Sequence, residues 1–390
     1  MASAPSGAGF AMTSWRESLR EKGIEARNRL IANPRFQSWA AKSPLTRRLA
    51  RKRARELFDL CAGFVYSQIL LACVRLRLFE FLATGPRSVD SVASHTALPR
   101  ESALRLLRAA ASLRLVCVLP GDRYGLDELG AAMLGNPAIT AFVEHHGLLY
   151  DDLRDPVALL KGEVSTQLGR FWPYAADGRE SELGGARTDR EAHGAYSALM
   201  SQTQPLVAED ILDAYRFADH VCLLDVGGGE GAFVAAAAAR APHLKLKLFD
   251  LPPVAELARQ RLAALGLADR VEVSGGSFLN DSLPLGADLV TIVRVLHDHD
   301  DDSALALLRA AYAALPRGGK VLVAEPMSGA RGAEPIGDAY FGLYLFAMGR
   351  GRPRTSEEVA GMLRAAGFQN VRALKTRRPM LASALIGERA

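Results

Sequence analysis

The sequence predicts an α/β fold: a doubly wound, mostly parallel seven-stranded sheet that follows an α-rich domain of winged-helix outline. One observation is the apolar run at 221–226, which has the length of a buried strand and leads into the glycine-rich turn 227–231. A second is the alternation of apolar runs and helical patterns after this turn, which is typical of a parallel sheet with crossover helices. The third is a series of three helical patterns and a short hairpin ahead of residue 135.

Residues 1–55 form a basic arm. From Arg16 to Arg55 the arm has 13 Lys and Arg against 3 Glu, a net of +10, so the rest of this +5 chain sums to about −5. Pro34 and Pro44 interrupt its helical pattern, and apolar and aromatic residues are spread among the basic ones. Two interpretations stay open, a helical extension that packs on a partner subunit and a segment that lies on an anionic membrane surface.

Residues 56–150 show the winged-helix outline. The apolar stretch 57–74 is interrupted by polar residues and is therefore interpreted as a buried helix rather than a membrane span. In a DNA-binding regulator, Arg100, Arg105 and Arg108 would contact phosphates or bases. A dimerisation module is favoured, because a DNA reader does not need the large nucleotide-type domain that follows, and no nucleic acid partner is expected.

Residues 151–220 are predicted to be helical connections that contribute to a substrate pocket. The aromatic group at 171–174 is more typical of a core than of a ligand contact, but it falls where an apolar substrate would enter. The cysteines at 61, 73, 117 and 222 lack metal or disulfide spacing and are expected to be reduced core residues, with no metal site. No signal peptide is visible, which favours the cytoplasm, either free or peripheral to the inner membrane.

Residues 221–390 carry the predicted sheet. Strands are expected at 221–226, 244–249, 271–273, 288–294, 320–324, 371–374 and 381–386, with the last two paired as a closing hairpin. Helices are expected at 230–240, 254–265, 303–315, 336–348 and 355–366.

Two ligand classes fit the glycine turn. Gly227, Gly229 and Ala232 match the dinucleotide pattern of a dehydrogenase, with a pyrophosphate on the helix terminus. Asp225, Gly227, Gly229 and Gly231 match the pattern of S-adenosylmethionine methyltransferases. Both predict Asp250, at the end of the second strand, as the acceptor for ribose hydroxyls.

The segments that follow the third and fourth strands favour the second class. With Gly275-Gly276-Ser277-Phe278 and Arg294-Val295-Leu296-His297-Asp298 in place, the chain from residue 57 onwards resembles the S-adenosylmethionine-dependent O-methyltransferases of the caffeic acid type. The resemblance implies a class I methyltransferase domain, a winged-helix dimerisation domain, a homodimer and S-adenosylmethionine as cofactor. Residues 27–55, 57–68 and 293–300 look most like the acyclic carotenoid O-methyltransferases, which methylate a hydroxyl at the end of a long polyene.

The resemblance makes His297 the catalytic base. An alcohol gains nucleophilicity when its proton leaves as the new bond forms, and an imidazole of ordinary pKa, about 6.5, is neutral at cytoplasmic pH. The alternative is that His297 caps the following helix. In plant members two glutamates flank the base. Here Glu325 matches one and Pro353 stands where the other aligns, so Glu325 is expected to orient the imidazole alone.

The resemblance also implies the cofactor pocket, whose expected residues are Asp225, Gly227, Gly229, Asp250, Ser277, Phe278 and Arg294. Ser277 stands where relatives place an aspartate near the adenine, and His299 stands where they usually have tryptophan. The substrate class remains open between a hydroxylated acyclic carotenoid and an aromatic polyketide, phenol or tetrapyrrole. Outside this class, a winged-helix regulator with a cofactor-sensing domain remains an alternative.

Overall fold

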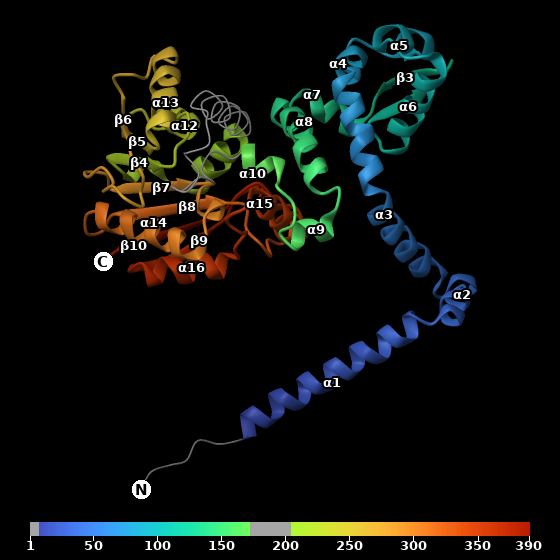
Figure 1. Ribbon diagram of the computed structural model, residues 1–390, viewed down its shortest axis with the longest axis horizontal. Helices are drawn as coiled ribbons and strands as arrows, with labels where there is room; N and C mark the ends of the chain where they lie inside the picture. Colours follow the sequence, from blue (N-terminus) through green and yellow to red (C-terminus); the bar gives the residue numbers. More distant parts are fainter. Residues whose placement is uncertain (1–7, 172–203) are drawn as a thin grey trace. The chain divides into compact units, whose positions relative to one another are not determined.

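The computed structural model describes residues 8–171 and 204–390 of the chain (Figure 1). The chain divides into two compact units, one that ends at Asp127 and one that begins at Glu128, and each is described by itself. The division expected from the sequence, with boundaries at 55, 150 and 220, stays a prediction. Three members of the predicted aromatic group, Trp172, Pro173 and Tyr174, lie outside the described residues.

The first unit begins with the basic arm, as helices α1 (Ala8–Ile31) and α2 (Pro34–Lys42) and the start of α3 (Arg47–Arg75). The breaks fall at the two prolines, as predicted. Pro34 occupies the first turn of α2, where its missing N–H is no loss, and Asn33 caps that helix through the N–H groups of Arg35 and Phe36.

Helix α3 differs from the prediction. Its last turns are buried at Leu71, Cys73 and Val74, but an apolar face in its middle is exposed. That face consists of Leu57, Phe58, Leu60, Phe64 and Val65. Cys61 is also exposed on α3, so it is not the core residue that was expected. The helix is long and apolar enough to cross a membrane by length and composition alone.

The first unit continues with α4 (Leu78–Ala83), α5 (Val89–Thr96) and α6 (Arg100–Ser112). A small antiparallel sheet has the order β1 (Arg87–Ser88), β3 (Arg123–Leu126), β2 (Val116–Leu119). The hairpin of β2 and β3 is the predicted one. Arg100 donates to Asp90 of its own domain at 2.8 Å, so this basic side chain already has a protein partner.

The second unit contains the seven-stranded sheet, in the order β6-β5-β4-β7-β8-β10-β9. Its strands are β4 (Cys222–Val226), β5 (Lys245–Asp250), β6 (Val271–Gly275), β7 (Leu289–Val293), β8 (Lys320–Glu325), β9 (Phe368–Leu374) and β10 (Ser383–Arg389). The first five are parallel, and β10 runs antiparallel to both β8 and β9, which confirms the predicted doubly wound sheet with its closing hairpin.

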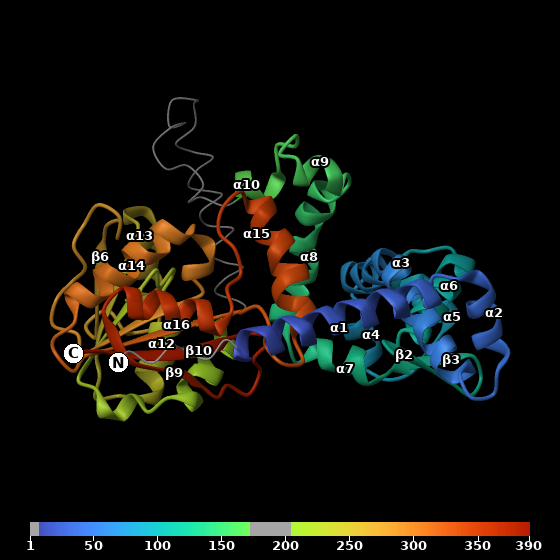
Figure 2. The ribbon, with the colours of Figure 1, turned by 90° about the horizontal axis from the view of Figure 1, so that it is seen from below.

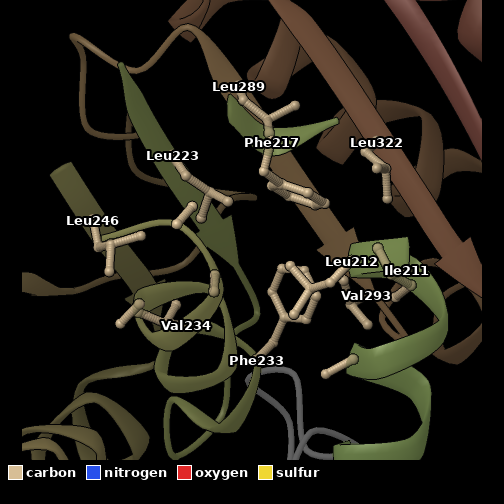
Figure 3. Close-up of a cluster of buried hydrophobic side chains, with 14 of the residues drawn as sticks. Ile211, Leu212, Phe217, Leu223, Phe233, Val234, Leu246, Leu289, Val293 and Leu322 are labelled. Atoms are coloured by element: carbon tan, nitrogen blue, oxygen red, sulfur yellow. The ribbon is translucent and has the colours of Figure 1, made fainter. Parts of the chain in front are cut away.

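Helices cover both faces of this sheet (Figures 1 and 2). One face packs against the helical segment 204–214, α12 (Ala232–Arg240) and α13 (Pro252–Ala264), and Figure 3 shows Phe217 and Phe233 among the strand leucines of this core. The other face packs against α14 (Asp301–Ala314) and α16 (Ser356–Ala365). Because parallel strands end at the same edge, polar residues that follow β4, β5, β7 and β8 are brought together.

Ahead of the helical segment 204–214 lie α7 (Glu128–Leu134), α8 (Pro137–Asp152), α9 (Pro156–Leu160) and α10 (Gln167–Phe171). The helix predicted at 336–348 is present, but it begins as a π-helical segment (Pro335–Phe341) and continues as α15 (Gly342–Met348). The backbone here lies very close to the end of β8, since a Cβ on Gly337 would be 2.7 Å from Cα of Ser328. Wide turns of this kind are frequent at functional sites.

Candidate active site

The glycine turn after β4 has a backbone that a ligand could approach closely. Gly227 and Gly229 have φ values of +69° and +56°, a region that L side chains rarely adopt. A Cβ on Gly227 would lie 2.6 Å from Cγ2 of Val295, in the loop after β7. The turn therefore has no side chains over its backbone at these positions, and it packs against the loop that carries His297.

Asp225 lies at the end of β4, and its carboxylate is buried beneath the glycine turn. Oδ1 accepts a hydrogen bond of 2.6 Å from Thr291 Oγ1, whereas Oδ2 has no hydrogen-bond partner within the described parts of the chain. Burial raises the pKa of Asp225 to about 7. An unpaired carboxylate oxygen in this position suits a cationic ligand group that supplies the missing hydrogen bond.

Asp250 ends β5 beside the same turn. Its Oδ2 accepts from the Gly229 N–H and its Oδ1 from the Leu251 N–H, both at 2.7 Å. Each carboxylate oxygen has two lone pairs, so the group retains capacity to accept two ribose hydroxyls. The structure thus places three of the expected cofactor residues, Asp225, Gly229 and Asp250, around one turn.

Ser277 and Phe278 follow β6 at the same edge. The Ser277 N–H donates to Oδ2 of Asp281 at 2.8 Å, so a carboxylate comes to this loop from four residues further along. Phe278 meets the ring of His299 edge-on, with 5.1 Å between centroids. Sequence reasoning missed Asp281 and gave His299 no role, and the contact places His299 beside an expected cofactor residue.

Arg294 follows β7 with a left-handed φ of 60°. Its backbone N–H donates to the Ala324 carbonyl at 2.8 Å, and its guanidinium donates to Oε1 of Gln204 at 3.3 Å. The strained residue turns the chain sharply into the segment of His297. A cofactor contact of Arg294 remains a prediction.

His297 lies in a short 3-10 turn (Leu296–Asp298) at the carboxyl end of β7. Its Nε2 is 3.1 Å from Oδ1 of Asp298, and its Nδ1 is 3.6 Å from Oε2 of Glu325. Burial lowers the pKa of His297, but the two carboxylates outweigh burial, so the net pKa is above its ordinary value. The imidazole is therefore more basic than the unperturbed group assumed from the sequence.

Glu325 has a different contact from the expected one. Its Oε2 accepts from the backbone N–H of His297 at 3.0 Å, while the distance to the ring nitrogen is longer than a hydrogen bond. Burial raises the pKa of Glu325. Asp298, to which sequence reasoning assigned no role of its own, contacts the ring instead. The alternative role of His297 as the cap of α14 is wrong, because Asp300 accepts from the Ser303 N–H at that position.

Sequence reasoning also missed Arg354. This side chain is fully buried, and it donates to the carbonyls of Leu296 and His299, each at 2.8 Å, and to Oδ1 of Asp301. Two residues earlier, the Arg352 N–H donates to the His297 carbonyl at 2.9 Å. The resemblance expects a second glutamate at the position of Pro353. In its place, the neighbouring residues Arg352 and Arg354 bind the backbone carbonyls of the catalytic turn.

A seven-stranded doubly wound sheet with a glycine turn and strand-end carboxylates defines a class I methyltransferase. Residues 150–369 match the O-methyltransferase domain family and residues 58–136 match the O-methyltransferase dimerisation domain family. The chain therefore belongs to the O-methyltransferase family, whose members use S-adenosylmethionine. Its exposed α3 face falls in the dimerisation domain, which supports a homodimer.

The chain is similar over most of its length to two bacterial enzymes. It is 45% identical over 361 residues to demethylspheroidene O-methyltransferase of Cereibacter sphaeroides, covering 93% of this chain and 94% of the relative. It is 38% identical to the enzyme of that name from Rhodobacter capsulatus, covering 93% and 88%. Among solved structures, mitomycin 7-O-methyltransferase has a TM-score of 0.70 at 26% identity and covers 88% of this chain and 99% of its own.

The site fits S-adenosylmethionine. The unpaired Oδ2 of Asp225 is suited to an ammonium group, and Cβ atoms on Gly227 and Gly228 would be within 3 Å of neighbouring side chains. The family decides between the two ligand classes that the sequence left open, and the enzyme transfers a methyl group to an oxygen of a small molecule.

Proposed function

We propose that this O-methyltransferase methylates a hydroxyl of an acyclic carotenoid of the demethylspheroidene or hydroxyneurosporene type. The observation that carries the proposal is the 45% identity to a demethylspheroidene O-methyltransferase over 93% of the chain. Other relatives, named for aclacinomycin, acetylserotonin and mitomycin, are 33%, 31% and 29% identical, so the polyketide and phenol alternatives have weaker support.

When bound, S-adenosylmethionine would supply a methyl group on a positively charged sulfur for transfer to an oxygen nucleophile. His297 accepts the hydroxyl proton as the oxygen attacks, because a free alkoxide of an aliphatic alcohol does not accumulate at neutral pH. Asp298, at 3.1 Å from Nε2, stabilises the imidazolium that forms.

The remaining residues position this base. Glu325 holds the backbone N–H of His297, and Arg354 holds the carbonyls on either side of the turn. Asp225 and Asp250, beside the glycine turn, would hold the cofactor. The expected roles of Gly227, Ser277 and Phe278 in the cofactor pocket form part of the same proposal.

The basic arm provides the contact with the membrane in which such a substrate dissolves. Its helices expose apolar and aromatic side chains among the arginines, including Leu30, Trp39 and Leu49, at 51%, 56% and 57% exposure. Anionic lipids attract each nearby basic residue by about 1 kcal/mol, and exposed aromatic anchors add to this attraction. The proposed location is the cytoplasmic surface of the inner membrane.

The test of the substrate class is an unbiased one. Purified enzyme is incubated with methyl-labelled S-adenosylmethionine and lipophilic extracts that contain both hydroxylated carotenoids and phenolic compounds, and products are identified by mass spectrometry. Label in a methyl ether of a hydroxylated polyene supports the proposal. Label confined to phenols or tetrapyrroles overturns it.

A further inference from the structure

Six aromatic and histidine side chains form a continuous group beside His297. Phe142, His145 and His146 come from α8, Tyr340 and Phe341 from the π-helical segment, and Tyr344 from α15, and they are called the aromatic cluster below. Figure 2 shows α8 and α15 side by side. The rings extend outward from the base, because Phe341 has its centroid 6.1 Å from that of His297 and 5.1 Å from that of Tyr340.

Two matching hydrogen bonds join the helices of the aromatic cluster. His145 Nε2 pairs with the Tyr344 hydroxyl and His146 Nε2 with the Tyr340 hydroxyl, both at 2.8 Å. Burial and the neighbouring His146 lower the pKa of His145 to about 4, and burial also lowers the pKa of His146. Burial raises the pKa of both tyrosines. All four side chains are therefore neutral near pH 7, and each pair joins a histidine Nε2 to a tyrosine hydroxyl.

The aromatic cluster has a fixed side and an accessible side. Tyr344 is buried against Leu149, Leu159 and Leu168, which holds the ring in place. Phe142, His146, Tyr340 and Phe341 are only half-buried, so part of each ring remains accessible. The half-buried histidine and tyrosine side chains thus expose uncharged rings. An apolar ligand can cover these rings without the desolvation cost of burying an unpaired polar group.

We propose that the aromatic cluster is the subsite that binds the conjugated chain of the substrate next to its reacting hydroxyl. This inference rests on the proposed function. The hydroxyl must lie at His297, and from there the nearest accessible aromatic surface leads over Phe341 to Tyr340 and Phe142. A flat, apolar polyene matches this row of rings, whereas a short alcohol would reach little beyond the first.

The test breaks one polar pair and then removes it. Tyr340→Phe and His146→Phe each leave one partly buried group unpaired, and each is expected to raise KM for a hydroxylated acyclic carotenoid about fivefold or more. The double variant Tyr340→Phe/His146→Phe has no unpaired group, and its KM is expected within about threefold of wild type. With a short acyclic alcohol that carries the same hydroxylated end, kcat/KM should stay unchanged in all three variants.

A matched control lies elsewhere in the same unit. Tyr215→Phe breaks an equally short Tyr–His hydrogen bond, 2.7 Å to His220, ahead of the amino end of β4. This variant should leave KM for the carotenoid unchanged. Unchanged KM in both single variants of the aromatic cluster, or a double variant at least as impaired as the singles, overturns the inference.

Direct binding separates this inference from the proposed function. The dissociation constant of an acyclic polyene hydrocarbon without a hydroxyl is measured from the shift of its visible absorption. Wild-type binding that Tyr340→Phe weakens about fivefold or more supports the subsite even if no carotenoid is methylated. Methyl transfer to a carotenoid with no such loss supports the function and overturns the subsite, and absence of both binding and transfer overturns both.

Discussion

Asp298 and Glu325 give His297 two carboxylate neighbours with different tasks. Asp298 contacts the ring through Nε2, and Glu325 fixes the backbone N–H of the same residue. A neutral imidazole accepts the proton, so turnover depends on the deprotonated form. Since the two carboxylates raise the pKa of His297, activity should be lost as the pH falls through a value above the ordinary one.

The first prediction concerns this loss of activity at low pH, which is the acidic limb of the pH profile. Asp298→Asn removes the largest contribution that raises the pKa of His297, so the limb of kcat against pH should move to lower pH while the maximal kcat falls. The measurement is a pH profile of kcat at saturating cofactor for wild type and variant. An unmoved limb would mean that another group sets the pH dependence.

Burial of the charged carboxylate of Asp225 lowers the stability of the folded protein, and its proposed role in cofactor binding explains why such a group is present. Its pKa is about 7 in the folded protein against 3.8 ordinarily, so the stability associated with its protonated form is full below 3.8 and is lost as the pH rises through 7. Three pKa units correspond to about 4 kcal/mol, which is an upper bound. The ammonium of a bound cofactor would offset this by favouring the charged form.

The second prediction follows from that cost. Asp225→Asn should unfold at a higher temperature than wild type at pH 8, with a smaller difference at pH 4, yet S-adenosylhomocysteine should protect the variant far less. Thermal unfolding with and without the ligand at the two pH values measures both effects. Equal protection of both proteins would remove Asp225 from the cofactor site.

At the residue scale, the strand-end acids were predictable from the sequence because parallel strands end at one edge. Asp225 and Asp250 could be identified in this way, whereas His297 was identified from the family resemblance. The ring contact of Asp298 depends on a rotamer, and Arg354 reaches the catalytic turn from more than fifty residues away in the chain. Neither is encoded in local periodicity, so neither could be found without the structure.

At the element scale, the segment 349–355 decides how firmly the catalytic turn is held. A Cβ on Gly351, at φ +77°, would overlap the carbonyl oxygen of His297, while a Cβ on Gly349, at φ +89°, would meet nothing within 4 Å. The two glycines thus share a left-handed backbone conformation but differ in what surrounds them. They form a matched pair for an experiment.

The third prediction uses this pair. Gly349→Ala should cost about 1 kcal/mol of stability and leave kcat unchanged, because an alanine in left-handed conformation is merely strained. Gly351→Ala should displace the catalytic turn and lower kcat at least tenfold, since small misplacements of a base are costly. Steady-state kinetics and thermal unfolding of both variants decide it. Equal kcat values would show that the segment does not position His297.

Secondary structure followed from the sequence where one periodicity dominated, as in the seven strands. The π-helical segment did not, because its apolar spacing matches an ordinary helix and its widening accompanies the contact of Gly337 with Ser328. The exposed face of α3 was predicted to be buried for a similar reason. The sequence of a helix shows that one of its faces is apolar, but it does not show whether the same chain or a partner subunit covers that face.

At the scale of the whole molecule, the charge is divided between the arm and the remainder. Thirteen basic residues against three acidic ones lie between Arg16 and Arg55, whereas the chain as a whole has a formal net charge of +5. The catalytic residues described above belong to the second unit, and the arm belongs to the first. Removing part of the arm therefore tests its role without changing a named catalytic residue.

The fourth prediction removes residues 1–46, which precede α3. The truncated enzyme should remain a dimer and keep its kcat on a short soluble alcohol, but bind vesicles with anionic lipid at least tenfold more weakly. Co-sedimentation with anionic and neutral vesicles at two salt concentrations measures this. Unchanged vesicle binding, or loss of the dimer, would instead assign residues 1–46, which hold seven of the thirteen basic residues, to packing on the partner subunit.

The central claim is that His297 assists direct methyl transfer to a carotenoid hydroxyl. The most direct measurement is a rapid-quench assay with S-adenosylmethionine that carries a trideuterated methyl group and a purified hydroxylated acyclic carotenoid. Wild type should give the methyl ether with all three deuterium atoms, and His297→Ala should form it about 10² to 10⁴ times more slowly at normal cofactor affinity. No ether with wild type, or a variant that keeps more than about a tenth of the wild-type rate, would contradict the account.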